Sequence, residues 1–392
     1  MKIGVFGGTF NPIHQGHLSL ATQFADRLGL DRVLLIPTAI PPHKSAQDLA
    51  PAEHRLNLCR LAAKTDPRFV PCDLELRREG PSYTVMTLRE LRNAYPKEDE
   101  FFLLMGSDMF LTFESWYMAG EIALLCTLCG GARDGGELEA LQAKEKEYRA
   151  RGWSCRVLDI QVKPLSSTQV RKKIRQGEPV EGFLPPQGEE YIRQNGLYGL
   201  DPGKYVYDIG GYVAQMKTLL KDSRRIHSLY VAKQAVRLAK RWGENETYAL
   251  VAGLLHDIQK NVPGDEQLQR IVNSDIIFEK TLPQQPKLWH AAAGAIYLRD
   301  ALNIHNLQIL NAVRYHTTGR ANMTRLEQIV YLADLTSKDR TYGGVEKMRD
   351  LADTSLDDAM REAMEFIMGD LLQKKALINS DTLGAYNCYV VR

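Results

Sequence analysis

The sequence predicts an α/β domain with a doubly wound parallel sheet, followed by an all-helical domain. In the first half, short apolar runs typical of strands alternate with stretches whose apolar residues recur at helical spacing. Such alternation indicates a parallel sheet with helices on both faces. From about residue 208 onward, nearly every segment shows helical spacing instead. The chain of 392 residues is also too long for one ordinary core, so we expect two domains.

The expected elements follow in order along the chain. Strands are predicted at 3–6, 33–36, 101–105, 122–128 and 155–160, and helices near 17–28, 52–64, 84–94 and 168–176. The charged stretch 134–152 is interpreted as a solvated surface helix. Further helices are predicted at 208–221, 226–242, 246–258, 287–301, 305–316, 324–334 and 355–376. A Gly- and Pro-containing linker at 199–207 then separates a domain at 1–198 from one at 208–392.

Composition narrows the class of protein. Hydrophobic residues make up 44% and charged residues 25%, as in a soluble globular protein. The net charge of +2 comes without a basic stripe, which argues against nucleic acid as the main partner. Because the chain enters a strand directly after Met1-Lys2 and has no membrane-length apolar run, we expect a cytoplasmic enzyme without membrane association. Cys126 and Cys129 form a C-x-x-C, for which redox or zinc chemistry is the alternative to our interpretation as buried core residues of a strand.

Residues 3–17 predict a nucleotide site. An apolar strand ends at Gly7 and Gly8, and a helical pattern begins near His17. Glycines let a phosphate approach the backbone, and the free N–H groups of a helix start point toward it. His14 and His17, three residues apart, fall on one side of that first turn.

Other segments place polar groups at the same edge of the sheet. Lys44 follows the second predicted strand, and Gly106 and Asp108 follow another, where ligands bind in such folds. Ser166 and Thr168 can cap a helix that carries Arg171 one turn inside. We assign His14, His17, Lys44 and Arg171 as catalytic donors to the phosphates of a nucleotide.

These residues carry a family resemblance. Gly-Gly-Thr-Phe-Asn-Pro-Ile-His-x-Gly-His and Ser-Ser-Thr-x-x-Arg resemble the H-x-G-H nucleotidyltransferases. Pro-Pro-His-Lys, Ser-Tyr-Thr at 82–84, Gly-Ser-Asp and Trp116 make residues 1–198 similar to the bacterial nicotinate-nucleotide adenylyltransferases. The resemblance implies that ATP and nicotinate mononucleotide react to give nicotinate adenine dinucleotide and pyrophosphate. The phosphates bound by the four catalytic donors are then those of ATP, with Mg²⁺ shared by the triphosphate. It also implies that Asp108 faces the adenylate half, while Trp116 stacks on the pyridine ring beside Thr84.

The substrate-binding residues expected for the first domain share these segments. They are Gly7, Gly8, Thr9, Phe10, Thr84, Gly106, Asp108, Trp116, Arg133, Ser166, Ser167 and Thr168. Asn11 and Met86 each replace an aspartate that is frequent in the family, which leaves the amidated mononucleotide open as a substrate. Another H-x-G-H transferase acting on a different phosphate is the alternative to this function.

The helical half predicts a metal centre. A single histidine on an apolar helix face is usually a core residue, but this half carries a set of potential ligands: His227, His256, Asp257, His290, His316 and Asp334. Imidazole and carboxylate suit iron, manganese, cobalt or zinc. Gly-Leu-Leu-His-Asp would bury a carboxylate next to an apolar run, and a buried carboxylate needs a cation. Asp257 could bridge a second metal through its two oxygens.

The ordered set resembles HD-domain phosphohydrolases. Arg225-x-His-Ser, His-Asp-Ile-x-Lys260, His290-x-x-x-Gly-Ala, Arg314-Tyr-His-Thr-Thr-Gly-Arg320 and Tyr331-x-Ala-Asp make residues 205–392 similar to the bacterial symmetrical diadenosine-tetraphosphate hydrolases. The resemblance implies one metal on His227, His256, Asp257 and Asp334, and a second on His290, His316 and a shared Asp257, with iron as the expected native metal. Asp257 and Lys260 are assigned catalytic roles, and Arg314 and Arg320 are expected to contact phosphate, although surface cations are an equal alternative for Lys260, Arg314 and Arg320.

Together these features predict a bifunctional enzyme whose partners are ATP, nicotinate mononucleotide and diadenosine tetraphosphate. Two alternatives stay open for the helical domain: it could hydrolyse another nucleotide, such as a deoxynucleoside phosphate, or bind a nucleotide as a sensor that regulates the transferase. The sequence leaves open whether the chain forms a homo-oligomer.

Overall fold

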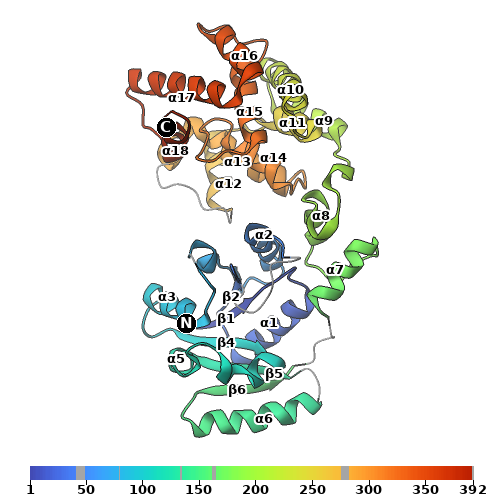
Figure 1. Ribbon diagram of the computed structural model, residues 1–392, viewed down its shortest axis with the longest axis vertical. Coiled ribbons are helices and arrows are strands. Elements are labelled where there is room, and N and C mark those ends of the chain that lie inside the picture. The colour runs from blue at the N-terminus through green and yellow to red at the C-terminus, as the bar shows by residue number, and fades with distance from the viewer. Residues whose placement is uncertain (41–48, 79, 133–134, 161–164, 275–281, 391–392) are drawn as a thin grey trace. The chain divides into compact units, whose positions relative to one another are not determined.

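The chain forms two units, one built on a parallel sheet and one built, over its described residues, from helices (Figure 1). The computed structural model describes residues 1–40, 49–78, 80–132, 135–160, 165–274 and 282–390. The units span Met1–Asp201 and Pro202–Arg392, so their boundary falls inside the segment predicted as a linker. Among the described residues, no helix combines the length and the apolar character needed to cross a bilayer.

The sheet of the first unit has a doubly wound order. Its strands are β1 (Lys2–Gly8), β2 (Arg32–Pro37), β3 (Phe69–Pro71), β4 (Glu100–Gly106), β5 (Thr127–Ala132) and β6 (Cys155–Asp159). All neighbours pair in parallel in the order β3-β2-β1-β4-β5-β6. The predicted fold class is therefore confirmed. The order reverses between β1 and β4, and the carboxyl ends of strands at such a reversal are where ligands bind.

Helices connect these strands and cover both faces of the sheet. They are α1 (Gln15–Leu28), α2 (Ala52–Ala63), α3 (Thr84–Ala94), α4 (Ser107–Leu111), α5 (Ala119–Leu125), α6 (Gly135–Ala150), α7 (Ser167–Gln176) and α8 (Gly188–Gln194). Ile3 and Val5 share a core cluster with α3 and α5. On the other face, Gly131 lies against Leu20 and Phe24 of α1, so close that a Cβ at position 131 would lie 2.9 Å from Leu20.

Two sequence predictions in this unit are wrong. The run 122–128 is not one strand: α5 occupies it to Leu125, and β5 starts at Thr127. Leu124 is 81% exposed, so the apolar run includes the outer face of an amphipathic helix. The stretch 134–152 is not simply a solvated helix either, because Leu141 and Tyr148 of α6 are fully buried. The short strand β3 was not predicted.

The boundary between α5 and β5 changes the account of the C-x-x-C pair. Cys126 directly follows α5 and Cys129 lies in β5, so the two thiols do not lie on one strand, contrary to the prediction. Both are buried, and burial raises the pKa of the Cys126 thiol to about 12. A thiol that stays protonated at neutral pH is a poor nucleophile and metal ligand, in keeping with a role in the core.

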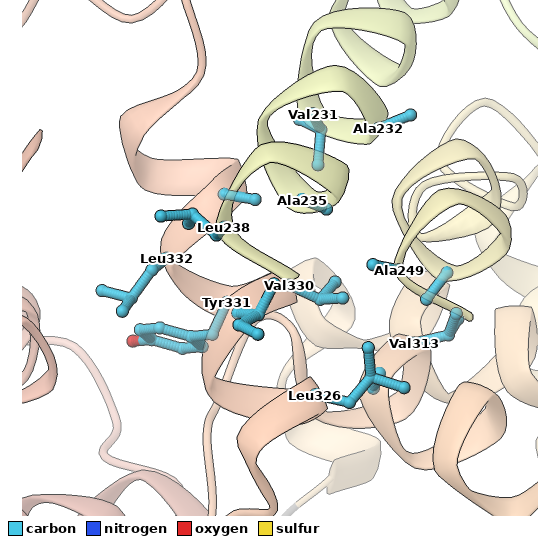
Figure 2. Close-up of a cluster of buried hydrophobic side chains, with 14 of the residues drawn as sticks. Val231, Ala232, Ala235, Leu238, Ala249, Val313, Leu326, Val330, Tyr331 and Leu332 are labelled. Carbon is cyan, nitrogen blue, oxygen red and sulfur yellow. The ribbon is translucent and has the colours of Figure 1, made fainter. Parts of the chain in front are cut away.

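The second unit is a helical bundle. Its helices are α9 (Ile209–Leu219), α10 (Asp222–Trp242), α11 (Glu246–Leu255), α12 (Gly264–Val272), α13 (Trp289–Asp300), α14 (Leu307–Tyr315), α15 (Arg325–Thr336), α16 (Val345–Thr354), α17 (Leu356–Gln373) and α18 (Ser380–Tyr389). Of these, α12, α16 and α18 were not predicted. Figure 2 shows Val231 of α10, Ala249 of α11, Val313 of α14 and Val330 of α15 converging in one apolar core.

A glycine allows two of these helices to approach closely. A Cβ on Gly253 of α11 would lie 2.7 Å from the Cα of Ala232 in α10 and 3.1 Å from its backbone nitrogen. Backbone atoms cannot rotate away, so Gly253→Ala should force the helices apart and cost about 3 kcal/mol, the upper end of overpacking effects. We expect a lowered melting temperature for the second unit alone. Gly369→Ala in α17, where nothing lies within 4 Å, is the control and should stabilise slightly. Equal melting temperatures for the two variants would contradict the prediction.

His54 in the first unit predicts a pH dependence of stability. Its Nδ1 lies 2.8 Å from the Tyr191 hydroxyl, and burial lowers its pKa from 6.5 to about 4. Because the unfolded chain binds the proton more tightly, the stabilisation is complete above pH 6.5 and is lost as the pH falls toward 4. After allowance for partial exposure, about 2 kcal/mol is at stake. His54→Gln should flatten the melting temperature of the first unit against pH in this window, and parallel curves for the two proteins would refute the assignment.

Candidate active sites

The loop after β1 presents a histidine with a defined proton position. The backbone N–H of His14 donates to Nδ1 of His17 at 3.2 Å, and the two rings stack with centroids 3.7 Å apart. A nitrogen that accepts a hydrogen bond carries no proton, so neutral His17 carries its proton on Nε2. Phe10 is buried, has a φ of 45° and packs edge-on against the His17 ring at 5.2 Å. The loop therefore holds His17 as a hydrogen-bond donor at the start of α1.

Helix α7 binds to the same loop. Ser166 caps α7 by accepting from the N–H of Gln169 at 3.2 Å. Ser167 Oγ donates to the carbonyl of Pro12 at 2.9 Å, and Arg171 Nη1 donates to the carbonyl of Asn11 at 2.8 Å. Nε of Arg171 is buried and has no hydrogen-bond partner among the described residues. Arg171 thus reaches the loop from 160 residues away and retains a donor suited to an anion.

Arg55 is a positioning residue that was not predicted from the sequence. It is 1% exposed and lies in α2. Its guanidinium donates to the carbonyls of Ala50 (2.9 Å), Thr9 (2.8 Å), Thr38 (2.7 Å) and Ala39 (3.4 Å). Arg55 therefore ties the loop after β1 to the loop after β2. An arginine in the first turns of a helix gives no sequence signal for such a role, because its partners are backbone carbonyls.

The remaining predicted residues of the first unit lie along the same sheet. Gly7 and Gly8 end β1, and Gly106 ends β4, two residues before the exposed Asp108 in α4. Thr84 begins α3 and Trp116 is half-buried against Phe113, with ring centroids 5.5 Å apart. The neighbours of these two residues, Tyr83 and Tyr117, contact each other with centroids 4.6 Å apart, so the two segments lie together. Thr168 is exposed in the first turn of α7, and Lys44 and Arg133 lie outside the described residues.

The second unit gathers its predicted ligands around one centre. Three groups each have ligand atoms within 4.8 Å of one another: His227, His256 and Asp257; His256, His316 and Asp334; and Asp257, His290 and His316. Asp257 Oδ1 lies 3.2 Å from His290 Nε2 and 3.6 Å from His316 Nε2. Two of the ligands lie where helices end, since His256 follows the last residue of α11 and His316 follows the last residue of α14.

Hydrogen bonds at Nδ1 of His256 and His316 determine that Nε2 of each ring faces the centre. Nδ1 of His256 lies 2.8 Å from the carbonyl of Gly253, and Nδ1 of His316 lies 2.7 Å from the carbonyl of Val313. Carbonyls only accept, so both rings carry their proton on Nδ1 and, when neutral, present the Nε2 lone pair to the centre. Nε2 of His256 is buried with no hydrogen-bond partner in the described part of the chain. This orphaned acceptor, together with the N/O donor set, fits a divalent transition metal.

Burial and neighbouring charges shift the pKa values of residues at this centre in both directions: burial opposes protonation of His256, but the charge of Asp257 raises its pKa. Burial lowers the pKa of His290 to about 4, so its ring is neutral at pH 7. Burial alone would raise the pKa of Asp257, but the facing histidines, His256 first, hold it well below its usual range. Burial likewise opposes ionisation of Asp334, and the hydrogen bond with His227 lowers its pKa. The centre therefore combines ionised carboxylates with a neutral imidazole.

Several groups at this centre were not predicted. Asp339 Oδ2 lies 2.7 Å from Nδ1 of His227 and its other oxygen accepts from Ser337 Oγ at 2.7 Å, which orients the imidazole. Arg224 and Arg340 contact the carboxylates of Asp257 and Asp334. Arg224 precedes His227 by three residues on α10, a spacing that places both on one helix face and that could have revealed it.

The structure shows which residues the other three predicted cations contact. Lys260 Nζ lies 3.1 Å from His290 Nε2 and 4.0 Å from Asp257 Oδ1, at the centre. Arg320 pairs with the buried Glu327 at 2.8 Å, at the start of α15. Arg314 stacks over the ring of Tyr315, 5.0 Å from its centroid.

Comparison with known proteins bears on both units. The cytidylyltransferase-like family model matches residues 5–173, and the HD-domain model matches residues 224–339. The probable nicotinate-nucleotide adenylyltransferase of Thermus thermophilus is 40% identical over 198 residues, which cover 50% of this chain and 100% of the relative. That of Dehalococcoides mccartyi strain CBDB1 is 36% identical over 198 residues, which cover 50% of this chain and 97% of the relative.

The chain belongs to the nicotinate-nucleotide adenylyltransferase family. Its adenylyltransferase unit is followed in the same chain by an HD domain, so the predicted fusion is confirmed. A crystal structure described as a predicted HD superfamily hydrolase involved in NAD metabolism, from Clostridium acetobutylicum, is 30% identical with a TM-score of 0.46, covering 48% of this chain and 98% of that one.

Proposed function

We propose that the adenylyltransferase unit transfers the adenylyl group of ATP to nicotinate mononucleotide. Family membership supports the reaction, and the geometry of the loop after β1 supports the roles of the residues. A phosphate oxygen of the mononucleotide attacks the α-phosphorus of ATP and pyrophosphate leaves, giving nicotinate adenine dinucleotide. The nucleophile is already anionic, so the site needs no general base and acts by positioning two polyanions.

The donors for that positioning come from this chain. His17 offers Nε2–H, and Arg171 offers its guanidinium from α7. In the proposal His14, Lys44 and the hydroxyls of Ser167 and Thr168 complete the phosphate site, and Mg²⁺ carried by ATP neutralises phosphate charge. The substrate test is chromatography of products after incubation of ATP with nicotinate mononucleotide or with nicotinamide mononucleotide. Faster dinucleotide formation from the nicotinate form supports the proposal, and faster formation from the amide would reverse the preference.

The HD domain, in the same proposal, hydrolyses diadenosine tetraphosphate to two molecules of ADP. The observation that carries it is the set of inward-facing Nε2 atoms and carboxylates at one buried centre. In the proposal His227, His256, Asp257 and Asp334 hold one divalent ion, and His290, His316 and Asp257 hold a second, with iron as the native metal. Such ions would activate a water molecule and neutralise phosphoryl charge.

The deciding experiment separates symmetrical cleavage from its alternatives. The full chain, loaded with iron under reducing conditions, is incubated with diadenosine tetraphosphate, and the products are resolved by chromatography. ADP alone, absent with His256→Ala, supports the proposal. AMP together with ATP would mean asymmetrical cleavage and would refute it. No turnover of this substrate, with turnover of a deoxynucleoside phosphate, would assign another nucleotide, and no turnover of either would favour a nucleotide sensor.

A further inference from the structure

Three cationic side chains form a rim around the buried ligands of the HD centre. They are Arg224 in α10, Lys260 after α11 and Arg340 after α15, with exposed fractions of 31%, 34% and 34%. The ligands Asp257, His290 and His316 are at most 3% exposed. Each of the three cations therefore contacts a buried ligand and is also partly exposed to solvent.

Each arginine of the rim engages a carboxylate of the centre. Arg224 Nη1 donates to Asp257 Oδ2 at 2.7 Å. Arg340 Nη2 donates to Asp334 Oδ1 at 2.5 Å and lies 3.4 Å from His227 Nε2. These carboxylates belong to the groups suited to a metal ion. A dication bound by these groups would therefore compete with the guanidinium groups for the same carboxylates.

The balance of charge at the centre changes when metal ions bind. The three cations of the rim pair with two carboxylates, Arg224 and Lys260 with Asp257 and Arg340 with Asp334, while Asp339 pairs with His227. Dications on Asp257 and Asp334 would satisfy those carboxylates, and the cations of the rim would lose their counter-charges while staying partly open to solvent. Guanidinium groups match phosphate oxygens through paired N–H donors.

We propose that Arg224, Lys260 and Arg340 form a polyphosphate subsite that becomes available when metal ions engage Asp257 and Asp334. The proposal rests on the proposed hydrolase function and names the part of the substrate that these residues bind: the phosphates next to the cleaved bond. The two arginines change partner, from carboxylate without metal to phosphate with it. Arg340 keeps its place meanwhile, because its Nε donates to the backbone carbonyl of Asp334 at 2.9 Å.

The test measures metal and phosphate binding separately on the full chain. Co²⁺ is titrated into the metal-free protein and followed by its visible absorption, and inorganic pyrophosphate is then titrated into the Co²⁺-loaded protein. His256→Ala provides the blank for signals from elsewhere in the chain. Arg224→Gln is the main variant because its guanidinium pairs with the Asp257 side chain, and thermal melting verifies that the variant is folded. Arg237→Gln, on the same helix and paired with Asp353, is the matched control.

We expect the Arg224→Gln variant to lose affinity for pyrophosphate without losing affinity for Co²⁺. Arg224→Gln should weaken pyrophosphate binding about 10- to 100-fold, as loss of a charge-assisted hydrogen bond does, and should leave Co²⁺ affinity unchanged or raised because a competitor is gone. Arg340→Gln should behave alike, and Arg237→Gln should change neither quantity. Weakened Co²⁺ binding by Arg224→Gln would overturn the proposal, since the arginine would then hold the carboxylate in place for the metal. Unchanged pyrophosphate binding would overturn it as well.

The binding measurements also separate a failure of the subsite proposal from a failure of the proposed hydrolase function. Pyrophosphate binding needs no turnover of a dinucleotide. A chain that binds pyrophosphate through Arg224 but does not cleave diadenosine tetraphosphate would refute the substrate and support the subsite. If instead the chain cleaves diadenosine tetraphosphate and the Arg224→Gln variant binds pyrophosphate as tightly as the wild type, the substrate is supported and the subsite is refuted.

Discussion

Replacing His256 by alanine should reduce hydrolysis of diadenosine tetraphosphate by about 10³-fold and leave adenylyl transfer unchanged. His256 is fully buried, its Nδ1 is bonded to Gly253, and the residue belongs to two of the candidate ligand groups. Loss of that ligand removes several kcal/mol of transition-state stabilisation, and about 4 kcal/mol corresponds to 10³-fold in rate. The measurement is the initial rate of ADP formation, with metal content determined on the same sample.

A second buried histidine provides the control for this variant. His305 is 1% exposed in the same unit and bonds to Asn303 at 2.7 Å. His305→Ala removes a comparable side chain and should retain hydrolysis at more than about half the wild-type rate, with any effect on melting temperature only. Equal loss in both variants would mean that disturbed packing, rather than a lost ligand, explains the effect of His256→Ala.

Replacing His17 by alanine should lower the kcat of adenylyl transfer by about 10²- to 10³-fold, the usual effect of removing one preorganised donor. The reason lies in the hydrogen bond from the His14 N–H to Nδ1 of His17, which places the proton of the neutral ring on Nε2, the atom that would donate to phosphate. Because the donor is worth most in the transition state, kcat should fall more than the KM for ATP rises.

Gln23→Ala is the matched control for His17. Gln23 lies on the same helix and bonds to Ser19 at 3.2 Å. Its loss should leave the kcat of transfer unchanged, and both variants should hydrolyse diadenosine tetraphosphate at the wild-type rate. If His17→Ala raised KM alone, the histidine would bind the ground state and the transition state equally, and its assignment as a catalytic donor would be wrong.

The fold was predictable wherever the apolar pattern had a single explanation. The strands at 3–6, 33–36 and 101–105 are buried on both faces, so a continuous apolar run marked them well. The run at 122–128 failed because a short amphipathic helix leads directly into a strand, and Leu124 on its exposed face is as apolar as the core. Helix α6 was misjudged because its buried residues, such as Leu141, are few among many charges.

The residues that would contact metal or substrate were predictable from the sequence, but most of the residues that surround and position them were not. Metal-ligand chemistry restricts the inward-facing residues to imidazoles and carboxylates, so His256 and Asp257 stand out in an apolar sequence. Residues that act through backbone carbonyls have no such restriction, which is why Arg55 went unnoticed. Arg224 and Arg340 were missed because arginines are common on surfaces. The spacing of Arg224 from His227 on α10 was a usable signal, whereas only the fold brings Arg340 to the ligands.

The imidazoles of His256 and His316 also serve the helices that precede them. The carbonyls of Gly253 and Val313 lie in the last turns of α11 and α14, where backbone acceptors lack partners within the helix. Each ring completes its helix terminus and is thereby aimed before any ion arrives, so folding itself organises the ligands. Treatment with a chelator should then silence the hydrolase without melting it, unlike a zinc finger, whose fold depends on its ion. An enzyme built this way can exchange its metal in the folded state, and the ion it carries would follow the supply in its surroundings.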